Sequence, residues 1–323
     1  KQYDKGNGKA YLRDYIVDIA YKVQQELEKV MLHLIQTAVR KTGIKNVCIA
    51  GGVGLNSVAN YKILKALCLD DIFIFPAAGD SGIAAGNALW AYQQFEKSPK
   101  RKKMTHAYLG RPYTSKEIES SIAKFNAKIN FKKLSEKELI QKAAEKLSQG
   151  SIIARHEGGS EFGPRALGHR SIIVDPSLDR MKDILNARVK FRESFRPFAP
   201  VVPEDISDEI FELKTHSPFM LLVADIKKEY QKLLPAITHN DGTGRVQTVN
   251  KKDNPFFYNL SYELKKQRKG PAVLLNTSFN VAGQPIVETP LESIETFLST
   301  DIDYLLIDNY WIEKTNVPVK KYQ

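Results

Sequence analysis

The chain has 323 residues, of which 42% are hydrophobic and 26% charged, a composition that excludes a disordered tail or a small fold held by disulfides. Its 48 Lys and Arg against 37 Asp and Glu give a net charge of +11, so we expect anionic partners, either nucleic acid or phosphorylated metabolites. The two cysteines argue against a cysteine-built metal site, and no apolar run approaches the roughly 20 residues of a membrane helix, so we expect a soluble, cytoplasmic protein.

The first hundred residues predict helices and strands that alternate along the chain. Apolar side chains recur with helical spacing from Ala10 to Thr42, which predicts one long buried helix. Strands are then expected at 47–50 and 72–75, each followed by a glycine-rich turn and a helix, at 56–69 and 83–95. Units of this kind are typical of parallel α/β architecture.

Two strands are too few for this first domain, because a parallel sheet needs cover on both faces and typically four or more strands. We therefore expect residues 1–97 to be incomplete, and the absence of an initiating Met indicates a C-terminal fragment that lacks the N-terminal half of the domain. An exposed half-domain would pair with that missing half or with another copy, as a homodimer. The charged stretch EKSPKRKK indicates a linker, at 98–105, before a second domain at 106–323.

The second domain is predicted to mix helices and strands. Ser135 and Glu138 have the spacing of a capping box, so a helix is expected to start there. The full set of predicted helices is 115–125, 136–147, 178–189, 254–267 and 291–299, and the predicted strands are 152–155, 171–174, 219–224, 272–275 and 304–307.

The densest group of unusual residues lies between 155 and 200, in the strings ARHEGGSEFGPRALGHRSIIVDP and NARVKFRESFRPFAP. Each guanidinium offers a rigid fork to two oxygens, so repeated arginine in turn-like sequence predicts a site for anions. A solvated basic face with structural ion pairs is the alternative. The candidates are Arg155, His156, Arg165, His169, Arg170, Lys190, Arg192 and Arg196.

Two further strings carry candidate ligand-binding groups. Residues 276–280 (NTSFN) are predicted to form a turn directly after strand 272–275, and polar groups at the carboxyl end of a strand are where open α/β sheets bind ligands. A turn that caps the next element explains the same residues. The stretch NDGTGR at 240–245 could wrap phosphate or form a plain surface loop.

The turns GGVGLN and GDSG each lie between a predicted strand and a predicted helix. Backbone N–H groups at such a helix start bind phosphate or hydroxyl oxygen, which makes Gly51, Gly52 and Asn56 candidates for binding. Asp80 is a candidate metal or substrate ligand. Close packing of helix against strand explains the glycines equally well.

Six strings, taken together, resemble one family, the O-carbamoyltransferases of the nodulation-factor and antibiotic (tobramycin, cephamycin, novobiocin) type. They occur in the family's order over nearly the whole chain: GGVGLNSVAN, FPAAGDSGIAAG, SEFGPRALGHRSIIVDP, VKFRESFRPFAP, TGRVQTV and LNTSFNVAGQPIVETP. The resemblance implies an α/β fold, in which the C-terminal part of an actin/Hsp70-type (Kae1-like) domain is followed by a YrdC-like domain.

The resemblance also implies a reaction in two steps. The YrdC-like domain would make carbamoyl-adenylate from carbamoyl phosphate and ATP with Mg²⁺, and the Kae1-like domain would pass the carbamoyl group to a hydroxyl of a small-molecule or sugar acceptor. The implied catalytic residues are Arg165, His169, Arg170, Lys190 and Arg196, and the implied binding residues for ATP and carbamoyl phosphate are Arg155, Arg192, Arg245, Asn276, Ser278, Asn280, Gly51, Gly52 and Asn56.

A metal is implied as well, iron in the best-matching members, held by a His-x-x-x-His pair and an aspartate that Asp80 matches. No two of the six histidines here are four positions apart, so Fe²⁺ or another divalent metal is expected only in the complete domain. A threonylcarbamoyl-type tRNA-modification protein, a hydrogenase-maturation carbamoyltransferase and a non-catalytic binding module are the alternatives. The strings GPRALGHRSI and FRPFAP resemble the small-molecule family and argue against nucleic acid as a partner.

Overall fold

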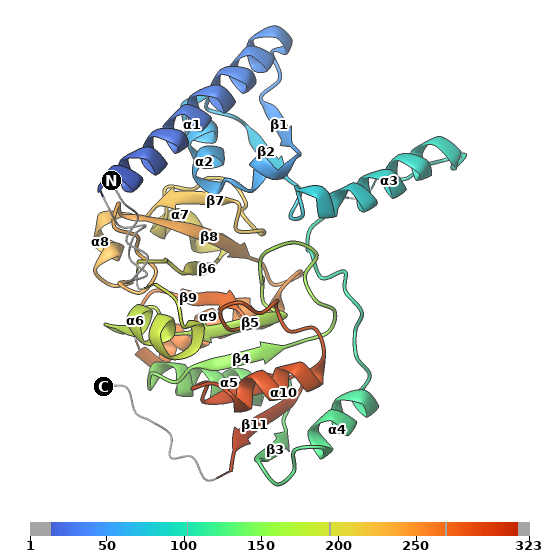
Figure 1. Cartoon of the computed structure of the whole chain (residues 1–323), viewed down its shortest axis with the longest axis vertical. Helices are drawn as coiled ribbons and strands as arrows, with labels where there is room; N and C mark the ends of the chain where they lie inside the picture. The colour runs from blue at the N-terminus through green and yellow to red at the C-terminus, as the bar shows by residue number, and fades with distance from the viewer. Residues whose placement is uncertain (1–13, 102, 194, 269, 316–323) are drawn as a thin grey trace, which may run out of the picture.

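A computed structural model describes residues 14–101, 103–193, 195–268 and 270–315 (Figure 1). These residues form two α/β units, one with a two-stranded parallel sheet and one with a nine-stranded mixed sheet. The α/β class predicted from the sequence is confirmed. Within the described ranges no helix is long and apolar enough to cross a bilayer, and Cys48 and Cys68 are both unpaired.

The first unit follows the predicted order closely. It contains α1 (Asp14–Thr42), β1 (Asn46–Ile49), η2 (Gly52–Leu55), α2 (Ser57–Ala66), β2 (Asp71–Ile74), η3 (Asp80–Gly82) and α3 (Ile83–Phe95). Strands β1 and β2 pair in parallel, from Asn46 opposite Asp71 to Ile49 opposite Ile74. Residues Ala10 to Arg13 of the predicted first helix lie outside the described residues.

Helix α1 is present, but the prediction that it is buried is wrong for much of its length. Met31 is 8% exposed and packs with Ala59 and Ile63 of α2. Val23 and Leu34, which belong to the same apolar rhythm, are 63% and 62% exposed. The periodicity therefore predicted the helix correctly. Burial of its apolar side chains also requires other elements to pack against them, and among the described residues α2 covers one side of α1. Helix α3 also extends away from the rest of the unit (Figure 1).

The second unit is built on a single sheet of mixed strand direction. The strand order is β3-β11-β10-β4-β5-β9-β6-β8-β7, in which β10 and β4 pair in parallel, as do β6 and β8, and the remaining neighbours are antiparallel. Its strands are β3 (Ile129–Lys133), β4 (Ile153–His156), β5 (Arg170–Val174), β6 (Ala199–Pro203), β7 (Leu222–Asp225), β8 (Thr243–Val249), β9 (Leu274–Ser278), β10 (Tyr304–Ile307) and β11 (Tyr310–Lys314).

Helices cover both faces of this sheet, as a mixed sheet with two apolar faces requires. One face packs against α4 (Ser115–Ala123), α6 (Met181–Leu185) and α10 (Pro290–Leu298), and the other against α5 (Glu136–Ser148) and α9 (Pro255–Arg268). Alternation along β5 divides the two cores, because Ile172 faces the first group and Ile173 the second. The short helices α7 (Ser207–Ile210) and α8 (Lys228–Gln231) lie near the β7 edge (Figure 1).

The two units share a contact between α2 and the β7 edge of the large sheet. Asn60 Nδ2 donates to the Leu221 carbonyl at 3.1 Å, and the Tyr61 hydroxyl donates to the Glu212 carbonyl at 2.7 Å. Tyr61 also belongs to the same apolar cluster as residues of the large sheet. The predicted linker, 98–105, falls in the stretch 96–114, whose described residues form no helix and only a single bridge, between Tyr108 and Glu161.

The predicted elements of the second unit differ from the structure at three places that matter for the site. Strand β9 runs to Ser278, so residues 276–278 lie in a strand and not in the predicted turn. Arg245 lies inside strand β8, where a loop was predicted. The predicted helix 178–189 ends early, because α6 is followed by a π-helical turn, η4 (Asn186–Lys190), which ends on Lys190.

Candidate active site

Lys190 is the most constrained cation of the site. Its side chain is only 5% exposed, and Nζ lies 2.8 Å from the Ser278 carbonyl, 3.2 Å from Ser278 Oγ, 2.9 Å from the Asn280 carbonyl and 2.7 Å from Asn280 Oδ1. These four oxygens are neutral, and burial lowers the pKa of Lys190 to about 7, helped by the charges of Arg192 and Arg196. The structure therefore brings together three residues that the sequence marked as candidates, Lys190, Ser278 and Asn280.

The charges of Arg192 and Arg196 act on this lysine, and Arg192 also acts on Arg245, as does Arg165. Burial, helped by the nearby charges of Arg165 and Arg192, lowers the pKa of Arg245 to about 9. Burial also lowers the pKa of Arg192 to about 10, with a further contribution from Arg196. Charges that depress one another's pKa lie close together, so these residues and Lys190 form one group, which we call the cationic cluster: Arg165, Lys190, Arg192, Arg196 and Arg245.

The cationic cluster has few anionic partners of its own. Arg196 Nη1 lies 3.7 Å from Glu193, which is the one carboxylate among the charges acting on Lys190, Arg192 and Arg245. Among the described residues, Nε of Arg165 and Nε of Arg245 are buried and have no hydrogen-bond partner. Buried donors without partners are costly, so a ligand with several anionic oxygens would stabilise this arrangement.

Arg192 is oriented by the π-helical turn that precedes it. Its Nε donates to Asn186 Oδ1 at 2.7 Å, and its guanidinium lies 4.6 Å from the centre of the Phe198 ring. Phe191, between the two basic residues, takes a left-handed conformation at φ 46°. A π-helical turn is frequent at functional sites, and here it turns Lys190 inward toward β9 while Arg192 follows immediately.

Arg165 reaches the cluster from the loop 163–170 (GPRALGHR), whose backbone carbonyls are held by side chains. Asn276 Nδ2 donates to the Ala166 carbonyl at 3.0 Å, and Gln247 Nε2 donates to the Leu167 carbonyl at 2.7 Å. Asn276 was predicted to bind ATP, but its Nδ2 is occupied by this loop and by Gln247, and its Oδ1 is buried without a hydrogen-bond partner among the described residues. Through its hydrogen bond to the Ala166 carbonyl, Asn276 holds the backbone next to Arg165.

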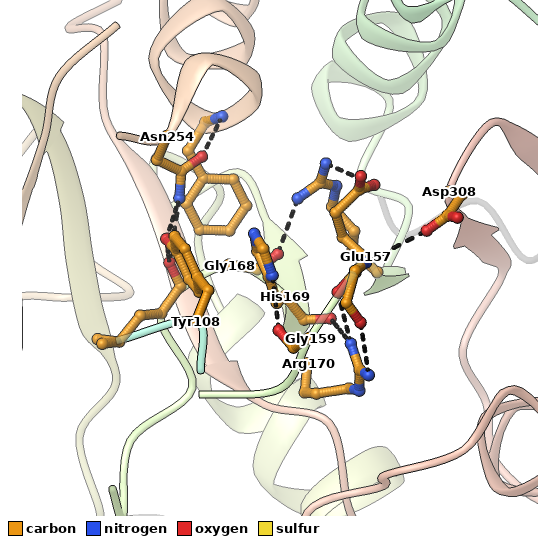
Figure 2. Close-up of polar contacts among 12 residues, drawn as sticks. Tyr108, Glu157, Gly159, Gly168, His169, Arg170, Asn254 and Asp308 are labelled. Carbon is orange, nitrogen blue, oxygen red and sulfur yellow. Dashed lines mark hydrogen bonds and ion pairs between the residues drawn. The ribbon is translucent and has the colours of Figure 1, made fainter. Parts of the chain in front are cut away.

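Asn254, Tyr108 and Arg155 complete this support (Figure 2). Asn254 Nδ2 and the Tyr108 hydroxyl both donate to the Leu167 carbonyl, at 3.1 and 3.0 Å, and Arg155 Nη1 donates to the Gly168 carbonyl at 3.0 Å. Arg155 also pairs with Glu157 at 2.9 Å. Both Nη atoms of Arg155 are therefore engaged by the loop and by Glu157, while its buried Nε has no hydrogen-bond partner among the described residues.

Arg170 is fully buried, and its polar contacts are to backbone carbonyls. Its guanidinium donates to the carbonyls of Glu157 at 2.7 Å and His169 at 3.0 Å (Figure 2), and also to those of Gly158 at 3.0 Å and Glu288 at 3.1 Å. These contacts use the whole fork of the side chain. The structure thus makes Arg170 a structural residue, although the sequence pattern predicted a catalytic one.

His169 is neutral and has a defined tautomer. Its Nδ1 lies 2.8 Å from the Gly159 carbonyl, which can only accept, so Nδ1 carries the hydrogen and Nε2 is an acceptor. The ring stacks on Tyr108 with centres 3.6 Å apart, and burial lowers the pKa of His169 to about 3. The imidazole lines a polar cavity of about 450 Å³ together with Arg155 and Asp308, separate from the contacts of Lys190.

The candidate residues of the first unit have local structural roles. Asn56 is the N-cap of α2, where its Oδ1 accepts from the Ala59 amide at 3.1 Å, and its amide group donates to Gln24. Gly51 takes φ 99° and its amide donates to the Ala78 carbonyl at 2.8 Å, while Gly52 is exposed beside it. These contacts fit the alternative that the glycine turn packs strand against helix.

Asp80 is exposed at the start of η3. In the part of the chain that the structure describes, no group of three or more His, Cys, Asp or Glu side chains lies close enough to hold a metal ion. A zinc-type centre needs at least three protein ligands, so the described residues do not complete one around Asp80.

The turn that carries Asp80 touches the loop that carries Arg165. Gly163 takes φ 135°, and a side chain there would lie 2.7 Å from the Pro76 carbonyl oxygen. The Phe75 and Phe162 rings meet edge to face at 5.9 Å beside this contact. The structure therefore joins the two glycine-rich strings that the sequence marked as separate candidates.

Three supporting residues were missed from the sequence, namely Tyr108, Gln247 and Asn254. A usable signal existed for Gln247, because it lies two positions after Arg245 on the same strand and so faces the same side. Tyr108 and Asn254 lie far from the loop in sequence, and only the fold brings them to it.

Comparison with known families gives two matches that together span most of the chain. The family described as Carbamoyltransferase N-terminus matches residues 3–89, and the one described as Carbamoyltransferase C-terminus matches residues 144–314. Two solved structures resemble part of the chain: full-length HypF in its phosphate- and nucleotide-bound form (TM-score 0.35, 18% identity, 60% of this chain and 23% of that one) and a variant of P. abyssi Sua5 (TM-score 0.36, 14% identity, 58% and 49%).

Several nodulation proteins are similar over most of this chain. Nodulation protein NolNO of Sinorhizobium fredii is 38% identical over 301 residues, which cover 92% of this chain and 44% of the relative. Nodulation protein NolO of Bradyrhizobium diazoefficiens is 37% identical over 301 residues, covering 92% and 54%. The chain thus spans about half the length of these relatives. Since the C-terminus family alone matches residues 144–314, more than half of its length, the chain belongs to the carbamoyltransferase family.

Proposed function

We propose that the second unit of this chain forms carbamoyl-adenylate from carbamoyl phosphate and ATP. The observation that carries the proposal is the cationic cluster, in which a lysine and four arginines gather and Glu193 is the one carboxylate that, among the described residues, acts on them. Both substrates of this reaction are polyanions, and so are the products phosphate and pyrophosphate. Because the chain belongs to the carbamoyltransferase family, we take the carbamoyl group to be the group transferred.

The proposed reaction consumes carbamoyl phosphate, water and ATP and yields carbamoyl-adenylate, phosphate and pyrophosphate. Water cleaves carbamoyl phosphate to carbamate and phosphate. A carbamate oxygen then attacks the α-phosphorus of ATP, the bond from that phosphorus to the bridging oxygen breaks, and pyrophosphate leaves with the electron pair. Mg²⁺ would enter with ATP, bound to its phosphates.

The residues of the cationic cluster would bind and orient these groups. Arg165 and Arg245 belong to the cationic cluster and each carries a buried Nε atom that lacks a hydrogen-bond partner among the described residues, so they are suited to hold phosphate oxygens. Lys190 would stabilise charge where it develops, because Ser278 and Asn280 fix its ammonium group. Preorganised donors of this kind contribute more than flexible surface lysines do.

The acceptor step is proposed for the complete protein. The carbamoyl carbon would form a bond with a hydroxyl oxygen of a small-molecule or sugar acceptor, AMP would leave, and the hydroxyl proton would be released. We assign this step to the first unit together with the part of the relatives that this chain does not span. Since the described residues do not fit a metal centre, no step is assigned to one.

The proposal is tested by incubating this chain with ATP and Mg²⁺, with and without carbamoyl phosphate, and measuring pyrophosphate. Release that depends on carbamoyl phosphate is expected. Arg165→Ala should lower it by roughly 100- to 1,000-fold, the effect of removing one preorganised donor. Arg111→Ala is the matched control, because Arg111 is exposed and pairs with Glu117 outside the cluster.

Two outcomes would contradict this assignment. If folded protein releases no pyrophosphate with carbamoyl phosphate but does so with bicarbonate and threonine, the chain is a threonylcarbamoyl-type enzyme. If Arg165→Ala and Arg111→Ala lower turnover equally, the cationic cluster is not the site of the reaction.

A further inference from the structure

Glu161 holds the loop 163–170 from the side opposite to the carbonyl contacts. A single carboxylate oxygen, Oε1, accepts from the backbone amides of Leu167 at 2.7 Å, His169 at 2.8 Å and Arg170 at 3.3 Å. Three N–H groups converging on one oxygen suit a carboxylate, whose charge makes each hydrogen bond roughly twice as strong as a neutral one. No site role is assigned to Glu161 by the sequence motifs or by the contacts of the cationic cluster.

The two sets of contacts fix both edges of the same short backbone. Asn276, Gln247 and Arg155 hold the carbonyls of residues 166, 167 and 168, while Glu161 holds the amides of residues 167, 169 and 170. Arg165 immediately precedes this clamped segment and extends from it to the cationic cluster. The position of its guanidinium therefore depends on the clamp, since a side chain is only as well placed as the backbone that carries it.

We propose that Glu161 is a positioning residue for Arg165, acting through the backbone of residues 167–170. The inference rests on the proposed function, because it assumes that Arg165 binds phosphate oxygens. It predicts that neutralising Glu161 changes the affinity for an anion in the direction opposite to the one expected from charge alone. Neutralising a carboxylate near an anion site should strengthen anion binding, whereas loss of a clamp on Arg165 should weaken it.

The test is a double-mutant cycle of Glu161→Gln and Arg165→Ala, read out by titration calorimetry with inorganic pyrophosphate on the full chain. Glu161→Gln should weaken pyrophosphate binding by about 10- to 100-fold, the cost of misplacing a binding group by an ångström or so. In the Arg165→Ala background the same substitution should have almost no effect, because the residue through which it acts is gone.

Glu138→Gln is the matched control, since Glu138 also accepts a backbone amide, that of Ser135 at 2.8 Å, at the exposed start of α5. It should leave pyrophosphate binding unchanged. If Glu161→Gln does not fold, Glu161→Asp keeps the charge but is too short to reach all three amides, and it should weaken binding in the same direction. Thermal unfolding of each variant establishes that the protein is folded.

Equal weakening by Glu161→Gln with and without Arg165 would overturn the inference, and so would stronger binding. If the wild-type chain does not bind pyrophosphate at all, the proposed function fails, and the inference is then decided by amide hydrogen exchange. Faster exchange at Leu167, His169 and Arg170 in Glu161→Gln, with exchange elsewhere unchanged, would support the clamp. Unchanged exchange at these amides would reject it.

Discussion

Anion binding to this chain should take up a proton, because of the unusual environment of Lys190. The ammonium group faces four neutral oxygens and two arginines, and burial lowers its pKa to about 7. A bound polyanion would favour the charged form and raise that pKa toward the ordinary value for lysine, near 10.5. Binding should therefore convert neutral Lys190 to its protonated form.

The size of the effect follows from the fraction protonated before binding. With a pKa of about 7, roughly 0.1 of the lysine is protonated at pH 8, so binding should take up about 0.9 proton. The uptake should fall to about 0.5 at pH 7 and about 0.1 at pH 6, where the lysine is already charged. Affinity should accordingly decline as the pH rises above about 7.

Titration calorimetry with pyrophosphate in buffers of different ionisation enthalpy measures this uptake directly. Lys190→Met is the control, because it keeps a side chain of similar length and isolates the ionisation of pyrophosphate itself. The difference in uptake between the two proteins should be about 0.9 proton at pH 8. No difference between them would refute the reasoning that links the burial of Lys190 to anion binding.

Two further substitutions test the contacts of the first unit. Gly163→Ala should lower the free energy of unfolding by about 1 to 3 kcal/mol, because φ is 135° and the new methyl group would meet the Pro76 carbonyl at 2.7 Å. Gly86→Ala, with open space around it, is the control, and an equal melting temperature for both would contradict this account. Asn56→Ala should cost roughly 1 kcal/mol through loss of the α2 cap and leave pyrophosphate release unchanged. Lost release without lost stability would instead restore the ligand-binding role.

Much of the fold could be predicted from local patterns. The capping box at Ser135 and Glu138 is present, and α2, β2 and α3 lie where the glycine turns indicated. Strands β3, β6, β8 and β11 were not predicted, because their sequences carry lysines, prolines or alternating polar residues that local propensity does not favour. Pairing with neighbouring strands overrides that preference, as in β8, where Arg245 and Gln247 lie in the strand between β6 and the edge strand β7.

The candidate site was predicted as a set of residues but not as an arrangement. Composition marks Arg155, Arg165 and Arg170 alike, since all three fall in one basic string. Their roles separate only when the strands pair: β4 lies antiparallel to β5, and Arg170 then meets backbone carbonyls, while Arg165 stays on the connecting loop and faces Arg245. The residues that hold that loop come from distant parts of the chain, and no local pattern connects them.

The cationic cluster draws its members from two kinds of structure. Arg245 belongs to strand β8 of the large sheet, and Lys190 is held by Ser278 of strand β9, whereas Arg192 and Arg196 lie between η4 and β6, outside any strand. The guanidinium of Arg245 is buried, so this side chain lost its rotamer freedom when the protein folded. The side chain of Arg196 is 53% exposed, so it still has rotamers to lose when a polyanion binds. Most of the side-chain entropy lost on ligand binding is therefore lost by the exposed arginine side chain, which can close over the ligand once the buried residues have oriented it.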